Sequence, residues 1–120
     1  MDEKEARAFL KYYGNFGGCE IRSIALDIDR GEARIFVHNI NAAPCLANLQ
    51  PRKGAIVFSG VVWSELLKVW KGETGRVVSI KVGKCGKDDY GLILEFAVLI
   101  AWREAPASYT IRCREITVVE

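Results

Sequence analysis

The chain has 120 residues and a mass of 13.4 kDa, which is the length of one domain and too short for two. Hydrophobic residues make up 50% of the sequence and charged residues 27%, a composition that can build a core and excludes a disordered or fibrous chain. Seventeen Lys and Arg against 15 Asp and Glu leave a net charge of +2. A dedicated nucleic-acid-binding protein is usually more basic. We therefore expect one domain over residues 1–120, with nucleic acid disfavoured as a partner.

The N-terminal segment Met1–Glu5 is acidic and polar, unlike the basic and then apolar start of a secretory signal peptide. This predicts a cytoplasmic protein. The longest apolar stretch, Leu92–Trp102, contains Glu95 and falls well short of the about 20 residues that a membrane-spanning helix needs. We expect no association with a membrane.

The first predicted element is a short amphipathic helix over residues 3–13. Asp2 is placed to cap its N-terminus, and Glu5 stands three positions later, as in a capping box. Apolar residues then recur at helical spacing. The three glycines within residues 14–18 should end this helix, because glycine favours turns over helix interiors.

A β-hairpin is predicted next. Apolar residues occupy every second position over Ile24–Ile28, the period of a half-buried strand, and Ile21 lies on the opposite parity. The change of parity indicates a bulge or twist near Arg22-Ser23. A tight turn over 29–32 should lead into a return strand over 34–40.

The remainder of the chain predicts a long connection, several strands and a second helix. Residues 39–54 form the connection, with a helical turn near 45–49. The further elements are strands over 55–58, 77–82, 92–102 and 109–119, and a helix over 64–71. The strand over 92–102 is apolar in both of its side-chain rows except at Glu95, so we expect a helix or a second subunit to cover each face.

These elements predict an α+β fold. Two short helices and about six strands joined mainly by hairpins favour a largely antiparallel sheet, either strongly bent or arranged as a small sandwich. The order of elements excludes a doubly wound nucleotide-binding fold.

No metal or cofactor is expected. The four cysteines, at positions 19, 45, 85 and 113, are too widely spaced for a zinc site, and His38 is the only histidine that could assist them. In a reducing compartment they should be free thiols. Cys85 stands beside Lys84 and Lys87, which would lower the pKa of its thiol. The sequence near it offers no acid–base partner, so an ordinary surface thiol is favoured over a functional one.

No catalytic site is expected either. The sequence contains no phosphate-binding glycine loop and no nucleophile elbow. His38 would act as a base only if a carboxylate such as Asp27 or Glu20 oriented it, and a surface histidine at a strand end is the favoured interpretation.

The candidate binding surface consists of Arg112, Arg114 and His38. Arg112 and Arg114 share parity in the last predicted strand, so they make one of its faces cationic. A strand face that is simply exposed to solvent explains these two arginines equally well. The tryptophans at 63, 70 and 102 suggest a stacking surface for bases, but their helical or strand spacing favours a place in the core.

The segment Phe16–Ile24 resembles the opening of a group of small bacterial β-rich proteins, some of which are assigned as immunity proteins of polymorphic toxin systems. Those proteins begin with Phe-His-Asp and then a small residue or Cys. Phe16, Cys19 and Ile21 match this opening, whereas Gly17-Gly18 replaces the His-Asp pair, so no role of that pair carries over. Residues 56–61 and 111–118 are similar to further strands of the group. The resemblance implies a protein partner, such as a toxin, and no catalytic residues.

We therefore predict a non-enzymatic protein-binding domain, of which an immunity protein that neutralises a cognate toxin is one form. The alternatives are a nucleic-acid-binding module that uses the Arg112 and Arg114 face, and a β-barrel that binds a small ligand. The sequence leaves open whether the chain forms a homodimer.

Overall fold

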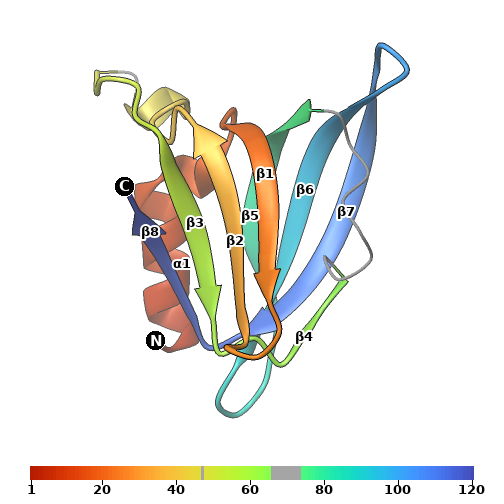
Figure 1. Ribbon diagram of the computed structural model, residues 1–120. Coiled ribbons are helices and arrows are strands. Elements are labelled where there is room, and N and C mark those ends of the chain that lie inside the picture. The colour runs from red at the N-terminus through yellow and green to blue at the C-terminus, as the bar shows by residue number, and fades with distance from the viewer. Residues whose placement is uncertain (47, 66–73) are drawn as a thin grey trace.

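The computed structural model describes residues 1–46, 48–65 and 74–120 (Figure 1). In these ranges the chain forms a helix, two short 3₁₀ turns and an eight-stranded sheet. The elements are α1 (Glu3–Tyr12), η1 (Gly14–Phe16), β1 (Glu20–Asp27), β2 (Glu32–His38), η2 (Pro44–Leu46), β3 (Gly54–Ser59), β4 (Trp63–Ser64), β5 (Thr74–Cys85), β6 (Tyr90–Ile100), β7 (Arg103–Cys113) and β8 (Glu115–Val119).

The sheet is antiparallel and open, with the order β4-β7-β6-β5-β1-β2-β3-β8. In Figure 1, β1, β2, β3 and β8 form a front wall, and β5, β6 and β7 diverge from it toward the right. α1 lies behind β3 and β8 and packs against β5 and β8 (Figure 1). The predicted α+β class with a mainly antiparallel sheet is confirmed. The number of strands is higher than expected, because short segments such as β4 carry no periodic signal.

The first helix forms where the sequence predicts it. The Asp2 side chain accepts a hydrogen bond of 2.8 Å from the backbone N–H of Glu5, which satisfies one of the free donors of the first turn. Ala6 and Leu10 are buried against the sheet. The backbone then enters the left-handed region at Gly14 (φ 59°), where a helix cannot continue.

The predicted β1–β2 hairpin and its bulge are also confirmed. Ile21 lies opposite Val37 and Ser23 opposite Phe36, so Arg22 is the extra residue. Beyond the bulge Ile24 shares its face with Ile35, on the side of the core. The change of parity in the sequence therefore located this irregularity correctly.

One core extends from α1 across the inner faces of β2, β3 and β8 and of β5, β6 and β7. Its buried side chains include Ile35, Ile56, Phe58, Ile80, Leu92, Leu94 and Ile116, together with Ala6 and Leu10 from the helix. Alternation along β2 and β8 sends every second side chain into this core.

The strand expected over 92–102 has different bounds and a different environment. β6 ends at Ile100, and Ala101 and Trp102 form the turn into β7. The inward row of β6 is buried as far as Val98, but Ile100 is 56% exposed and Trp102 is 89% exposed. In the other row, Ile93 is 40% exposed. The prediction that this run is buried on both faces is wrong, because its last residues make a hairpin that leaves the body of the sheet.

Other boundaries differ as well. The strand expected over 109–119 is two strands, β7 and β8, separated at Arg114. The helix expected over 64–71 falls mainly on residues outside the described ranges, and Ser64 itself ends β4. Within the described ranges, no helix has the length and apolar character to cross a membrane.

Candidate functional site

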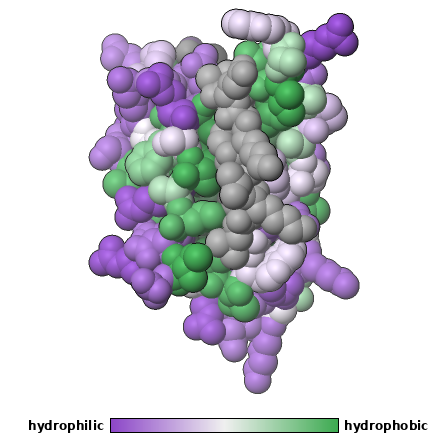
Figure 2. All heavy atoms as spheres, turned by 45° about the vertical axis from the view of Figure 1, so that its right-hand side comes forward, coloured by the Kyte–Doolittle hydropathy of each residue, from purple (hydrophilic) through white to green (hydrophobic). Residues whose placement is uncertain are grey.

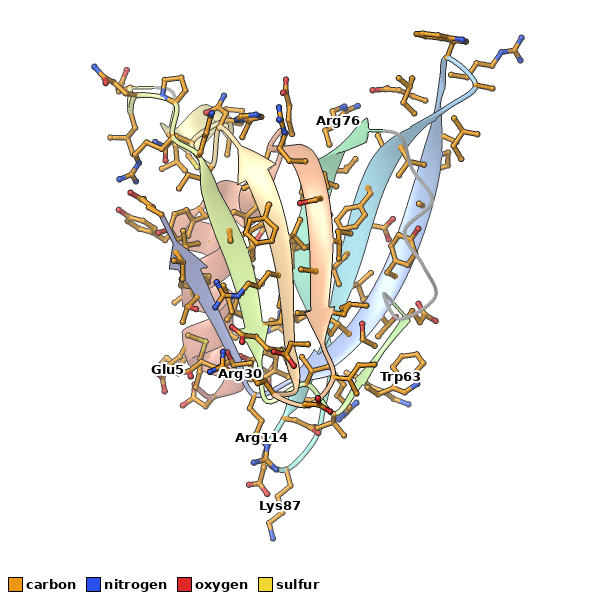
Figure 3. All side chains as sticks on the ribbon, in the orientation of Figure 1. Glu5, Arg30, Trp63, Arg76, Lys87 and Arg114 are labelled. Atoms are coloured by element: carbon orange, nitrogen blue, oxygen red, sulfur yellow. The ribbon has the colours of Figure 1, made fainter. Side chains whose placement is uncertain are left out.

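The three residues of the predicted binding surface do not come together. β2 runs from Glu32 to His38, and Glu32 pairs with Ser59, whose carbonyl accepts a hydrogen bond from the N–H of Arg114. His38 and Arg114 therefore lie at opposite ends of β2, roughly 20 Å apart at about 3.3 Å per residue. Figure 3 shows Arg114 at the lower end of the sheet.

Arg112 is engaged by a carboxylate. Its Nε donates to Asp89 Oδ1 at 2.8 Å, and both side chains are partly buried. Arg112 is in β7, whereas Arg114 is at the corner before β8, so the two do not form one face of a single strand. A phosphate that approached Arg112 would have to compete with Asp89.

His38 lies on the outer face of β2, in a shallow groove of about 400 Å³ that also contains Arg22, Arg34 and Lys53. Glu20 is opposite His38 in the β1–β2 ladder, and Asp27 is at the far end of β1. Of the two carboxylates considered as partners of this imidazole, only Glu20 is its neighbour in the sheet.

The surroundings of Cys85 disfavour its thiolate. Desolvation raises its pKa, and a hydrogen bond and repulsion from the Glu3 carboxylate raise it further, against the weaker opposing effects of Arg7 and Arg112. The pKa lowering expected from Lys84 and Lys87 is therefore wrong, because α1 brings an acidic side chain to the thiol that the local sequence does not reveal. All four cysteines are free thiols, of which Cys19 and Cys113 are buried.

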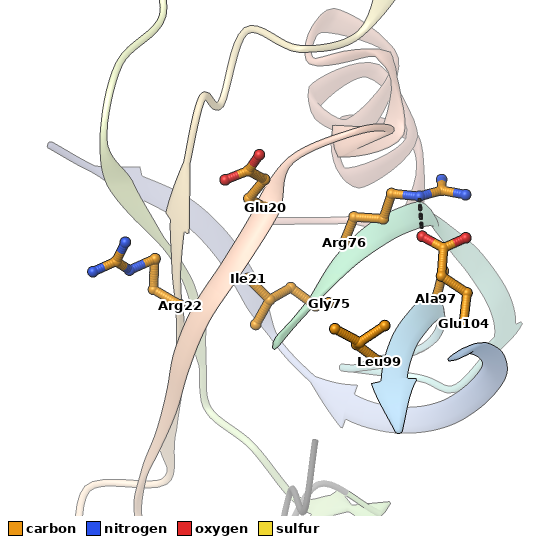
Figure 4. Close-up of a pocket in the computed structure, with 8 residues that line it drawn as sticks. All are labelled: Glu20, Ile21, Arg22, Gly75, Arg76, Ala97, Leu99 and Glu104. Atoms are coloured by element: carbon orange, nitrogen blue, oxygen red, sulfur yellow. Dashed lines mark hydrogen bonds and ion pairs between the residues drawn. The ribbon is translucent and has the colours of Figure 1, made fainter. Parts of the chain in front are cut away.

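The strongest candidate site is a groove of about 410 Å³ where β1 and β5 separate (Figure 4). We call it the tip groove, because the β6–β7 hairpin tip forms one of its walls. It is lined by Glu20, Ile21 and Arg22 of β1, Gly75 and Arg76 of β5, Ala97 and Leu99 of β6, and Glu104 of β7. The small residues Gly75 and Ala97 leave space at its floor.

Charged side chains surround this apolar floor. Arg76 Nε donates to Glu104 Oε1 at 3.3 Å, an exposed ion pair that joins β5 to β7 (Figure 4). Glu20 and Arg22 stand on the opposite side of the groove. An apolar floor with a polar rim is the usual anatomy of a protein-binding surface.

The turn of the β6–β7 hairpin stands next to the tip groove. Leu99 and Glu104, which line the groove, are paired across the hairpin just before the turn. Ala101 and Trp102 connect the strands with φ angles of 49° and 68°. Two successive left-handed residues are characteristic of a type I′ hairpin turn, where Asn-Gly is strongly preferred. This chain has alanine and an exposed tryptophan there instead.

A second, smaller groove of about 220 Å³ lies at the other end of β1. We call it the turn groove, because the β1–β2 turn forms one wall. Leu26 and Ile28 line it on one side, and Val62 and Trp63 on the other. All four are exposed hydrophobic residues. Figure 2, which brings the right-hand side of Figure 1 forward, shows hydrophobic side chains gathered down this side of the molecule.

No protein-family model matches the chain, and no curated protein or solved structure matches it either. Within the described ranges there is also no cluster of three side chains able to hold a metal ion.

Sequence reasoning missed both grooves. Trp63 and Trp102 were expected in the core, yet they are 51% and 89% exposed. The signal for a tight turn at 101–102 was missing, because neither residue is Gly, Asn or Asp. A weak signal was present in the length of the apolar run, which at 92–102 is longer than a typical strand.

Proposed function

We propose that this chain is a protein-binding domain without catalytic chemistry of its own, and that its interface is the tip surface, meaning Ile100, Trp102 and the tip groove. The rim and floor of the groove provide polar and apolar contacts side by side. Ile100 and Trp102 add two exposed apolar side chains at the end of the hairpin.

The observation that carries this proposal is the conformation of Ala101 and Trp102. A left-handed conformation costs a residue with a side chain roughly 1–2 kcal/mol, and here two such residues are adjacent. Trp102 recovers little of this cost by burial, since 89% of it is exposed. Strained backbone with an exposed large side chain is typical of functional sites. Tryptophan is also among the residues most enriched in binding hot spots.

The resemblance to immunity proteins supplies the first class of partner to test, a toxin domain. An immunity protein acts by covering a site on its toxin, which requires a surface of this kind rather than a catalytic centre. The match of Phe16, Cys19 and Ile21 supports this class. In this chain Ile21 reaches the tip groove.

The two alternatives have less support. Arg112, on which a nucleic-acid interface would depend, is held by Asp89. A small-ligand barrel would need a closed sheet, whereas β4 and β8 are the two edges of this one.

The test is capture of proteins from the source cells by the immobilised chain, in parallel with two variants. Trp102→Ser removes the tip side chain, and Tyr12→Ser is the matched control, because Tyr12 is an aromatic residue 66% exposed on α1. We expect a protein that the unmodified chain and Tyr12→Ser retain and that Trp102→Ser loses. If every captured protein is retained by Trp102→Ser as well, the tip surface is not the interface.

A further inference from the structure

The groove beside His38, which we call the outer groove, lies on the face of β2 and β3 that is turned away from the core. Both strands are paired on each side, so a complete part of the sheet forms its floor. Its volume of about 400 Å³ is within the range of roughly 300–1,000 Å³ that is typical of small-ligand pockets. It shares only Arg22 with the tip groove.

The end of β2 and the start of β3 place an imidazole beside an ammonium group in this groove. The β2–β3 ladder begins at Gly54, so Lys53, the residue before it, lies next to His38 on the neighbouring chain segment. The N–H of Ile40 donates to the carbonyl of Arg52 at 3.0 Å, which holds the segment before β3 against the end of β2. The backbone therefore fixes the position of Lys53.

The bulge in β1 brings a guanidinium to the same end of the groove. Arg22 is inserted between the levels of His38 and Phe36 in the β1–β2 ladder, and its side chain is exposed. A bulge re-aims a side chain, and bulges are common beside functional sites. In Figure 4 the Arg22 guanidinium points away from Arg76 on the far side of the tip groove. With β2 between them, the backbones of Arg22 and Lys53 are roughly 10 Å apart, a gap that their long side chains can close around one anion.

This group of three side chains has no counterion in the part of the chain that the structure describes. Arg22, His38 and Lys53 form no ion pair there. Glu20 is opposite His38 in the ladder, but it lines the tip groove and does not line the outer groove. Two cations with an imidazole between them create a positive field at this end of the groove, which attracts an anion.

The other charged residues that line the outer groove are already engaged. Arg34 donates from Nη2 and Nε to Glu32 Oε1 at 2.9 Å and 3.1 Å. The Glu120 carboxylate is held by Arg52 at 2.9 Å. The charge that remains to meet a ligand is therefore positive, and it is concentrated around His38.

An exposed aromatic ring lies beside this cationic end. Phe36 and His38 are two positions apart on the outer face, roughly 7 Å along the strand. The neighbours of Phe36 on the adjacent strands are Ser23 and Ala55, whose small side chains leave its ring 38% exposed. An exposed ring of this kind is a platform on which a planar ring can stack.

We propose that the outer groove binds a mononucleotide, with the base stacked on Phe36 and the phosphate held by Arg22, His38 and Lys53. The sugar spans the separation between the aromatic platform and the cationic end. A phosphate dianion matches two cations and an additional N–H donor, and the arginine fork suits its oxygens. The site lies apart from the tip surface and does not rest on the proposed function.

A single nucleotide fits this groove better than a nucleic-acid strand does. Surfaces for single-stranded nucleic acid stack successive bases on several aromatic side chains along a positively charged groove. The outer groove offers one such platform, Phe36, and one cationic end. Its lining therefore matches one base and one phosphate.

The test is isothermal titration calorimetry of the purified chain at one low ionic strength. The probes are AMP and UMP, with ribose 5-phosphate as the phosphate without a base. At least one nucleotide should bind about fivefold or more tightly than ribose 5-phosphate, because a stacked base adds affinity. Arg22→Gln and Lys53→Gln should each weaken nucleotide binding by about tenfold or more, since each removes a charged hydrogen bond. Phe36→Leu should remove the preference for the nucleotide and leave the affinity for ribose 5-phosphate unchanged.

Three variants serve as matched controls. Arg30→Gln and Lys87→Gln remove the same charges at the lower end of the sheet, away from His38 (Figure 3). Arg76→Gln removes a charge from the tip groove. All three should bind the nucleotide as the unmodified chain does, and thermal unfolding confirms that every variant folds.

Four results would overturn the proposal. Neither nucleotide may bind more tightly than ribose 5-phosphate, which would show that the base is not recognised. Equal losses in Lys53→Gln and Lys87→Gln would show that binding follows net charge alone. A loss in Arg76→Gln without one in Lys53→Gln would place the ligand in the tip groove. A hexamer of adenylate that binds more than about tenfold more tightly than AMP would identify a nucleic-acid strand as the occupant.

Discussion

The molecule has a closed half and an open half, which treat apolar side chains in opposite ways. The closed half is the core between α1 and the inner face of the sheet, where Ile35 and Phe58 are completely buried. The open half consists of the tip groove, the turn groove and the tip of the β6–β7 hairpin, where Leu26, on the core side of its strand, is 36% exposed and Trp63 is 51% exposed. The difference comes from cover, because α1 packs against β5 and β8, whereas no residue of α1 lines either groove. Apolar residues of similar type therefore stabilise the fold in one half and are available for binding in the other.

The hairpin tip in the open half also carries a feature that reduces stability. Ala101 and Trp102 adopt left-handed conformations. Natural chains keep such features where function requires them. The comparison therefore predicts which substitutions affect stability and which affect binding.

The largest effect is expected in the closed half. Phe58→Ala should lower the free energy of unfolding by about 3–5 kcal/mol, because the ring is fully buried in the core and its removal leaves a cavity. Leu26→Ala should cost less than about 1 kcal/mol, because its side chain already meets solvent. Urea denaturation of both variants measures the difference. Equal losses for the two variants would show that the second half is closed as well.

A substitution at the tip should raise stability and abolish binding. Replacing Ala101-Trp102 by Asn-Gly gives the turn its preferred residues, and we expect a gain of about 1–2 kcal/mol in the free energy of unfolding. The same variant should lose the partner in the capture experiment. A variant that is no more stable than the unmodified chain would mean that the tip stores no strain.

The closed half should also lose stability in alkali. Burial raises the pKa of Cys19 to about 11 and that of Cys113 to about 12, from an ordinary value of 9.0. Below the ordinary value both states of the chain keep these protons. Above it the unfolded chain releases them first, so the free energy of unfolding falls as pH rises toward the folded pKa.

The urea midpoint, followed from about pH 8 to about pH 10, tests this effect. The decline should be shallower in Cys113→Ala than in the unmodified chain. It should be unchanged in the control Cys45→Ala, because Cys45 is exposed. An identical decline in Cys113→Ala would assign the alkaline loss to other groups, such as Tyr90, whose pKa burial also raises.

Local signals in the sequence predicted the start of α1 and the bulge in β1 well. Asp2 and Glu5 located the start of α1, and the parity change around Arg22 located the bulge. Both are consequences of neighbouring residues acting on the backbone. The α+β class followed from the same periodicities.

The open half could not be predicted in this way. The tip groove joins residues from β1, β5, β6 and β7, and their meeting depends on the way the sheet bends. Trp102 was predicted to lie in the core because periodicity shows which side chains share one face of a strand. Periodicity cannot show where the elements that cover that face end. Cys85 was misjudged for a related reason, since Glu3 reaches it from a helix far away in sequence.

In the described ranges no strand pairs with the side of β1 away from β2 between Ser23 and Asp27, and amide hydrogen exchange in the free chain tests most directly whether this edge is open. The N–H groups of Ser23 and Ala25 point to β2, and those of Ile24 and Leu26 point away from it. We predict alternating exchange, slow at Ser23 and Ala25 and fast at Ile24 and Leu26. Uniformly slow exchange over these four residues would contradict the open edge, because it would mean that the far side of β1 is already paired.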